Sequence, residues 1–208
     1  MTHRDNLGIR FSMKVHYLAI VALTLCLPVP FLTSSYAVEQ RTEFSFQDPG
    51  NVIDEFHAVS PGIYRGAVPG VNGLQALAKF GVKTIINLKT NFTGDDERRI
   101  AESLGMQYVA KPMVPFLRPQ DRDMAEILRI LADGSQHPVF VHCRHGQDRT
   151  GLVIGLYRVF VENWSPAAAY DEMLRYNFHP ELSALQSYFE EKTDWSPKGE
   201  LIYELVTL

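Results

Sequence analysis

The segment VFVHCRHGQDRTGLVIG, residues 139–155, places a cysteine and an arginine between two apolar runs. Five residues separate Cys143 from Arg149, and the chain then enters an apolar stretch typical of a buried helix. A short loop at a helix N-terminus directs several backbone N–H groups into one concavity, where the helix dipole adds positive potential. Arginine can donate two hydrogen bonds to two oxygens of a tetrahedral anion. This spacing therefore predicts a phosphate-binding loop.

The residues within this loop favour nucleophilic chemistry. The positive field favours the thiolate form of Cys143, which is the nucleophilic form, and Gly146 allows a close backbone approach that a side chain would obstruct. Thr150 can donate its hydroxyl to the sulfur when the sulfur becomes the leaving group. Together they predict attack on a phosphate ester through a phosphocysteine intermediate. A metal site at His142, Cys143 and His145 is the alternative, but the sequence has no second Cys/His cluster, so we expect no metal and no cofactor.

The first 37 residues predict a secretory signal peptide. Basic residues precede an apolar run at 17–27, and the small residues Ser35 and Ala37 suit cleavage after Ala37. This run of eleven residues is too short to span a bilayer, which needs about twenty. We therefore expect an exported, periplasmic or secreted protein without a transmembrane anchor in its mature form. Met13 is an alternative start.

Charge and cysteine content restrict the mature chain further. Residues 38–208 carry 17 Lys and Arg against 23 Asp and Glu, a net charge of −6, which argues against nucleic-acid binding. Cys143 is the one cysteine left after cleavage, so no internal disulfide can form and an unpaired thiol remains. The length predicts one domain over residues 57–208 after a loosely structured arm at 38–56. We expect a monomer.

The order of predicted elements is typical of an α/β fold. We expect extended pieces at 57–58 and 63–65, strands at 82–88, 106–111 and 138–142, and helices at 74–80, 95–104, 119–131, 150–160, 166–176 and 181–192. Because the strands read as continuous apolar runs, they predict a central, mostly parallel sheet with helices on both faces. Ligands of such sheets bind beyond the carboxyl ends of the strands, where Cys143 lies.

The segment HCRHGQDRTG resembles the HCxxGxxR(S/T) signature of the cysteine-dependent protein tyrosine and dual-specificity phosphatase superfamily. The order of GIYRGAVP (62–69), KTIINL (83–88), the signature and NWSPAAAYDEMLRY (163–176) is similar to the plant and fungal atypical dual-specificity phosphatases and their bacterial relatives, over about residues 50–190. The resemblance implies a dual-specificity phosphatase-like fold and phosphatase activity, with Cys143 and Arg149 catalytic. It also implies phosphate contacts from the rest of the loop: Arg144, His145, Gly146, Gln147 and Thr150.

The resemblance leaves the general acid open. Family members usually carry an aspartate on a mobile loop before the cysteine, but the corresponding stretch here has none until Asp121. A leaving alkoxide needs a proton, so some group must supply it. Asp148 is a second candidate, because DRT within the loop is similar to the myotubularin and Sac-type phosphoinositide phosphatases, where an acid at that position has been assigned this role. We favour Asp148, with Asp121 and Asp123 as alternatives.

Basic residues at the predicted carboxyl edge favour a polyanionic substrate. Six of them lie on this edge or near it: Lys89, Lys111, Arg118, Arg122, Arg144 and His145. Together with DRT, they favour an inositol polyphosphate, such as phytate, or a phosphoinositide. The alternative substrate is phosphotyrosine or another phosphoprotein. A catalytically inactive phosphate-binding module is a remote alternative.

Overall fold

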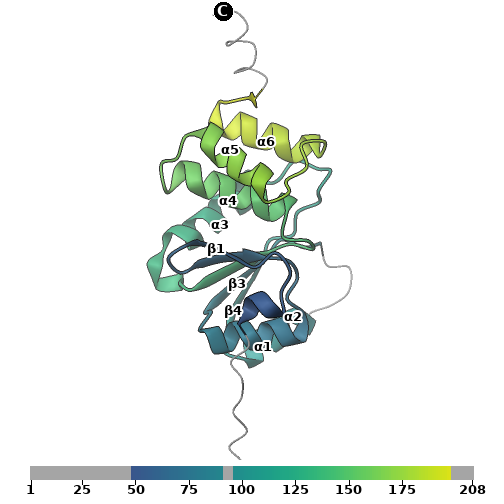
Figure 1. Ribbon diagram of the computed structural model, residues 1–208, viewed down its shortest axis with the longest axis vertical. Helices are drawn as coiled ribbons and strands as arrows, with labels where there is room; N and C mark the ends of the chain where they lie inside the picture. Colours follow the sequence, from purple (N-terminus) through teal and green to yellow (C-terminus); the bar gives the residue numbers. More distant parts are fainter. Residues whose placement is uncertain (1–47, 91–95, 198–208) are drawn as a thin grey trace, which may run out of the picture. The chain divides into compact units, whose positions relative to one another are not determined.

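The computed structural model describes residues 48–90 and 96–197 (Figure 1). The predicted signal peptide and the first part of the predicted arm, up to residue 47, lie outside the described residues. The strands are β1 (His57–Ser60), β2 (Ile63–Gly66), β3 (Thr84–Asn87), β4 (Gln107–Ala110) and β5 (Val139–His142). The helices are α1 (Gly70–Phe80), α2 (Asp96–Ser103), α3 (Asp121–Ala132), α4 (Asp148–Phe160), α5 (Pro166–Arg175) and α6 (Ser183–Thr193), with short 3-10 turns η1 (Pro49–Asn51) and η2 (Gly134–Gln136).

The five strands form one sheet in the order β1-β2-β5-β3-β4. The pairs β2–β5, β5–β3 and β3–β4 are parallel, and β1 pairs with β2 in the antiparallel direction at one edge. The predicted mostly parallel sheet is therefore confirmed, and β5, which leads into Cys143, lies between β2 and β3.

Helices cover both faces of the sheet, as predicted. Helices α1 and α2 lie on one side, and α3, α4, α5 and α6 lie on the other (Figure 1). Adjacent strand residues point to opposite faces, so Ile85 packs with Leu74 and Leu77 of α1, whereas Ile86 packs with Ile127 of α3. Every residue of β3 and β5 is buried, so these two strands read as apolar runs instead of alternating patterns.

Helix α4 is the most deeply buried helix among the described residues. Every residue from 149 to 158 is buried, because α4 packs against α3, α5, α6 and β5. Its lack of a polar face in the sequence follows from this position. The end of α4 that receives the 143–147 loop is therefore held on several sides.

The sequence located several helix ends correctly. Ser165 caps α5 by accepting a hydrogen bond from the Ala168 N–H at 3.2 Å, as its Ser-Pro start predicted. Gly81 ends α1 with a left-handed φ of +94°, and its N–H donates to the carbonyl groups of Leu77 and Ala78.

Part of the predicted N-terminal arm packs into the domain. Ile53 is only 3% exposed, and the ring of Phe56 stacks on Tyr64 with the centroids 5.6 Å apart. The packed domain therefore extends to residues before 57, the boundary expected from sequence. A short 3-10 turn has no hydrophobic periodicity to reveal it. Among the described helices, none has the length and apolar character needed to cross a membrane.

Candidate active site

The 143–147 loop joins the end of β5 to the start of α4. Cys143 follows β5 directly, carries a free thiol and is 2% exposed. Gly146 has a φ of +75°, and a Cβ there would lie 2.6 Å from the carbonyl carbon of Gly66. The loop therefore requires glycine at 146 for two reasons: its left-handed conformation and its close approach to β2.

A buried arginine of β2 supports this loop through a hydrogen bond to its backbone. Arg65 is 1% exposed, its Nη2 donates a hydrogen bond of 2.8 Å to the carbonyl oxygen of Gly146, and its guanidinium lies 4.4 Å from the ring centroid of Tyr176. Because a peptide group is planar, fixing the Gly146 carbonyl also fixes the following N–H, which points the opposite way. Arg65 thus preorganises the backbone donors of the loop.

Arg149 is anchored by the backbone of two neighbouring segments. Its Nη1 donates to the carbonyl oxygens of Leu88, at 3.4 Å, and Met113, at 3.3 Å, and the side chain is largely buried. A guanidinium has five N–H donors, so these contacts leave donors for an anion. Arg149 also lines a cavity, so such an anion has room beside it.

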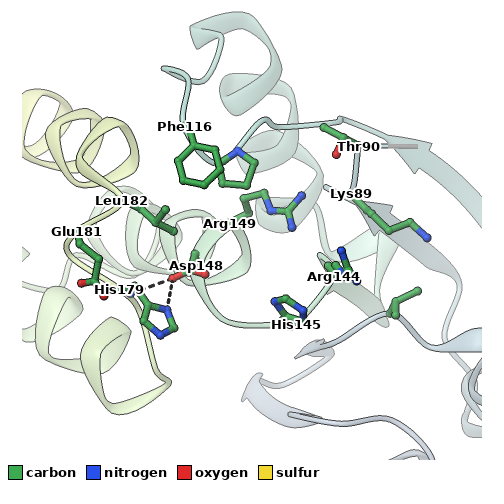
Figure 2. A pocket seen from close by; sticks show the side chains of 12 residues that line it. Lys89, Thr90, Phe116, Arg144, His145, Asp148, Arg149, His179, Glu181 and Leu182 are labelled. Atoms are coloured by element: carbon green, nitrogen blue, oxygen red, sulfur yellow. Dashed lines mark hydrogen bonds and ion pairs between the residues drawn. The ribbon is translucent and has the colours of Figure 1, made fainter. Parts of the chain in front are cut away.

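This cavity, of about 870 Å³, lies beyond the carboxyl ends of the parallel strands (Figure 2). Its walls come from the segments after β2, β3, β4 and β5 and from the segment between α5 and α6. The lining residues are Val68, Lys89, Thr90, Pro115, Phe116, Arg144, His145, Asp148, Arg149, His179, Glu181 and Leu182. The ligand position expected for a parallel α/β sheet is thus where the cavity lies.

The cavity combines cationic groups with an apolar wall. Its basic members are Lys89, Arg144, His145, Arg149 and His179. Val68, Pro115, Phe116 and Leu182 supply apolar surface, and Phe116 is 75% exposed. Such a cavity suits a ligand that has both an anionic group and an apolar or ring-shaped part.

Asp148 contacts a histidine that the sequence analysis did not consider. Its Oδ1 accepts two hydrogen bonds from His179, one from the backbone N–H and one from Nδ1, both at 2.9 Å. The hydrogen bond from Nδ1 and the carboxylate charge raise the pKa of His179 above its usual value. The carboxylate also lies in the first turn of α4, where the helix dipole favours negative charge.

A second polar network lies beside the nucleophile loop. Nε2 of the fully buried His142 is 2.8 Å from Glu97 Oε1, and the Tyr108 hydroxyl donates to the same oxygen at 3.0 Å. On the other side of the imidazole, His142 Nδ1 is 3.2 Å from the Cys143 carbonyl oxygen. Burial alone would raise the pKa of Glu97, but His142, Lys89 and Tyr108 lower it to about 2. His142 is thus fixed between Glu97 and Cys143, the first residue of the loop.

The structure brings most of the predicted site residues together. Lys89, Arg144, His145, Asp148 and Arg149 all line the cavity. Gly146 and the fully buried Thr150 belong to the loop and the first turn of α4. The side chain of Gln147 turns away toward Glu55, to which its Nε2 donates at 3.4 Å.

Five other predicted residues do not line the cavity: Lys111, Arg118, Asp121, Arg122 and Asp123. Lys111 instead forms ion pairs of 3.1 Å with Asp123 and 2.6 Å with Glu126 of α3. Asp121 is exposed and pairs with Arg118 and Lys192. Of the three aspartates weighed as the general acid, only Asp148 lines the cavity.

Most of the cavity residues missed from the sequence come from two loops, while Val68 follows β2 and Thr90 follows β3. Pro115 and Phe116 lie between β4 and α3, and His179, Glu181 and Leu182 lie between α5 and α6. The order of the elements could have indicated the second loop. Helices α5 and α6 pack on α4, so the segment that connects them can lie near the start of α4. In residues 48–90 and 96–197, no three His, Cys, Asp or Glu side chains are grouped as metal ligands would be.

Comparisons with known proteins agree with the geometry of the site. A family model described as "Tyrosine phosphatase family" matches residues 52–198. Dual specificity protein phosphatase TpbA of Pseudomonas aeruginosa is 34% identical over 126 residues, which cover 60% of this chain and 56% of that protein. Inositol diphosphatase DSP4 of Arabidopsis thaliana is 30% identical over 125 residues, which cover 58% of this chain and 63% of that protein. The chain thus spans a little over half the length of the curated relatives it matches.

Solved structures show the same fold. A TpbA variant from P. aeruginosa in complex with pTyr has a TM-score of 0.56 and 27% identity, covering 69% of this chain and 85% of that chain. The catalytic domain of the PP-IP phosphatase SIW14 from Saccharomyces cerevisiae has a TM-score of 0.57 and 22% identity, covering 70% and 96%. At that identity, the likeness to SIW14 concerns the fold alone.

Proposed function

The chain belongs to the tyrosine phosphatase family, and from this premise we propose that it is a cysteine-dependent phosphatase that hydrolyses phosphate monoesters through a phosphocysteine intermediate. The observation that carries the proposal is one arrangement. Cys143 directly follows the central strand β5, the loop turns at Gly146, and Arg149 is anchored in the first turn of α4 with the cavity beside it.

Each part of this arrangement has a role in the proposed reaction. Cys143 Sγ attacks phosphorus, the bond between phosphorus and the ester oxygen breaks, and the leaving oxygen takes a proton from Asp148. Water then attacks phosphorus and gives a proton to the Asp148 carboxylate, and the sulfur leaves as a thiolate. Arg149 and the N–H groups of the loop and of the first turn of α4 stabilise the charge on the phosphoryl oxygens throughout.

The buried hydroxyl of Thr150 has a role in the second step. It is fully buried and has no hydrogen-bond partner among the described residues. A buried hydroxyl without a hydrogen-bond partner costs free energy. A partner that becomes available during the reaction would remove this cost. We assign that partner as the Cys143 sulfur when it departs from phosphorus.

The proposed substrate is an inositol polyphosphate or a phosphoinositide. Five basic side chains line the cavity, His179 among them, and more than one is needed to bind a substrate that carries several phosphates. The relative DSP4 is named an inositol diphosphatase. Phosphate groups that are not being hydrolysed would contact Lys89, Arg144 and His145.

A second candidate substrate is phosphotyrosine in a protein. The exposed ring of Phe116, with Pro115 and Leu182, offers an apolar wall on which an aromatic ring can pack. TpbA, a dual specificity protein phosphatase by name, has been solved with pTyr.

Hydrolysis of p-nitrophenyl phosphate tests the reaction. We expect activity in the wild type that vanadate blocks, that a chelator leaves intact and that Cys143→Ser abolishes. Arg149→Lys should reduce kcat by about 100-fold or more, because lysine cannot reproduce the fork of donors. An inactive wild type, a chelator-sensitive activity or an active Cys143→Ser variant would each overturn the proposal. Initial rates on phytate, a phosphoinositide and a phosphotyrosyl peptide then decide between the two substrate classes.

The proposed setting is outside the cytoplasm, as a monomer. The support is the sequence pattern of residues 1–37, with its apolar run and its small residues before the expected cut. N-terminal sequencing of the expressed protein should begin at Val38, and an intact N-terminus in the cell-envelope fraction would refute export with cleavage. Light scattering of the purified protein tests the oligomeric state.

A further inference from the structure

The contact between Asp148 and His179 joins two parts of the domain at the cavity. Asp148 begins α4, and His179 lies 31 residues later, between α5 and α6. Both donors of His179, its backbone N–H and its Nδ1, lie 2.9 Å from Oδ1. Two bonds to one oxygen leave Oδ2 as the carboxylate oxygen available to a ligand. Figure 2 shows both side chains at the cavity wall.

This geometry places a titratable donor behind the proposed general acid. The Asp148 side chain is 18% exposed and that of His179 is 49% exposed, so His179 exchanges protons with solvent more readily. The pKa of His179 is raised chiefly by its hydrogen bond to Asp148 and by that carboxylate's charge, and less by Glu181. The other titratable groups that line the cavity with them are Lys89, Arg144, His145 and Arg149.

We propose that His179 is a positioning residue for Asp148, and that the two side chains share one proton which His179 holds between turnovers. The inference rests on the proposed function and on Asp148 as its acid. Two interacting titratable groups exchange protons as a unit, so the pair, and not the aspartate alone, sets the pH range of acid catalysis. The backbone N–H of His179 fixes the carboxylate orientation in either protonation state.

The proton balance of the pair closes over one turnover. Before the reaction, His179 is an imidazolium and Asp148 a carboxylate. The shared proton reaches Oδ2 of Asp148 from Nε2 of the exposed imidazole through solvent, while Nδ1 keeps its proton and its hydrogen bond to Oδ1. As the ester bond breaks, the leaving oxygen takes the proton from Oδ2, and the pair is left as a carboxylate and a neutral His179. When water attacks phosphorus, its proton returns to the pair, and His179 becomes an imidazolium again.

The pair predicts the sign of a pH effect. The shared proton is held up to a pH above the ordinary range of a histidine, because the pKa of His179 is raised. A lone aspartic acid ordinarily loses its proton near pH 4, roughly two units lower than a histidine. Removing the imidazole should therefore move the alkaline limb of the activity profile toward acid.

The test is the pH profile of kcat/KM for phenyl phosphate, a substrate with a poor leaving group. We expect His179→Asn, which keeps the backbone donor and a side-chain amide, to lower the alkaline midpoint by roughly two pH units. The variant should retain activity on p-nitrophenyl phosphate, whose leaving group needs no proton. The matched control is His57→Asn, a histidine of β1 outside this cavity that pairs with Glu55 at 3.5 Å, which should leave the midpoint in place.

A readout independent of activity is the NMR titration of His179. Its midpoint should fall by about one pH unit or more in Asp148→Asn, because the variant lacks the carboxylate charge. An unchanged NMR midpoint, or an alkaline limb that stays in place in His179→Asn, overturns the inference. Because these outcomes can occur in an enzyme that still hydrolyses p-nitrophenyl phosphate, they are distinct from failure of the proposed function, which an inactive wild type would show.

Discussion

Nε2 of His142 lies 2.8 Å from Oε1 of Glu97, while Nδ1 of the same ring lies 3.2 Å from the carbonyl oxygen of Cys143. The two ring nitrogens thus link a carboxylate of α2 to the first residue of the nucleophile loop. If this fully buried imidazole changed its orientation, at least one ring nitrogen would lose its polar partner while remaining buried. The contact connects the stability of the fold with the geometry of the loop.

The Glu97 carboxylate should make folding stability depend on pH. The pKa of Glu97 in the folded chain, about 2, lies below the ordinary value of 4.5. Its contribution is therefore fully present above pH 4.5 and is lost as the pH falls toward 2, by about 3 kcal/mol over that range. Urea unfolding at a series of acidic pH values should show this loss in the wild type and a flatter limb in Glu97→Gln. The control is Glu102→Gln, which replaces an exposed residue in the last turn of α2 and should show the same pH dependence of stability as the wild type. The same pH dependence in the wild type and Glu97→Gln would contradict the assignment.

Replacing Gly146 should damage both the fold and the reaction. Gly146→Ala forces a side chain into a left-handed backbone position and brings its Cβ to 2.6 Å from Gly66. We expect a loss of about 3 kcal/mol in unfolding free energy and a fall of about 100-fold in kcat/KM from loop displacement. The control is Gly134→Ala, where a Cβ meets no atom within 4 Å. Equal melting temperatures for the two variants would show that the loop relaxes around the methyl group.

The apolar wall of the cavity should act on substrates with rings. Phe116→Ala removes a side chain that is 75% exposed, so the melting temperature should stay unchanged. KM for tyrosine phosphate should rise about three- to ten-fold, which corresponds to the free energy of one aromatic–aromatic contact. KM for an alkyl phosphate should not change. Phe160→Ala, an exposed phenylalanine at the other end of α4, serves as the control. An equal rise for aryl and alkyl phosphates would show that Phe116 shapes the loop and does not contact the ring.

Lys89 and Lys111 should behave differently although each follows a strand. Lys89→Met should raise KM for phytate about five-fold, because Lys89 lines the cavity and pairs with a single carboxylate, that of Glu97, at 3.3 Å. Lys111→Met should leave KM within about two-fold, because that ammonium is paired with Asp123 and Glu126 on the surface of α3. Steady-state kinetics at fixed ionic strength measure both. Matching effects would mean that both lysines act through the overall field of the protein.

The sequence predicted the fold well where local signals and burial agree. The strand leading into Cys143, the cap at Ser165 and the helix end at Gly81 each have a nearby cause, so a single chain segment reveals them. The positions of Cys143 and Arg149 follow from the same kind of local signal, a strand before the loop and a helix after it. Their spacing alone determines that both lie at one helix N-terminus.

The remaining site residues depend on contacts between distant segments. His179 hydrogen-bonds to Asp148 across a separation of 31 residues, and no local sequence pattern near either residue predicts this contact. Lys111 was placed at the correct edge of the sheet, but the direction of its side chain is decided by the carboxylates of α3. Ile53 belongs to the core through its packing beside Gly66 and Gly73, a contact without periodicity in the sequence.

The hydrogen bond from Arg65 to the Gly146 carbonyl also makes local opening of the molecule cooperative. β2 cannot separate from β5 without withdrawing this donor from the loop, so fluctuations of the sheet and of the anion site belong to one opening unit. A bound oxyanion such as vanadate should therefore slow amide hydrogen exchange not only in the loop but along β2, whose residues the ion does not touch. Phosphate binding would then stabilise β2 against local opening and, through β2, the edge strand β1 that pairs with it.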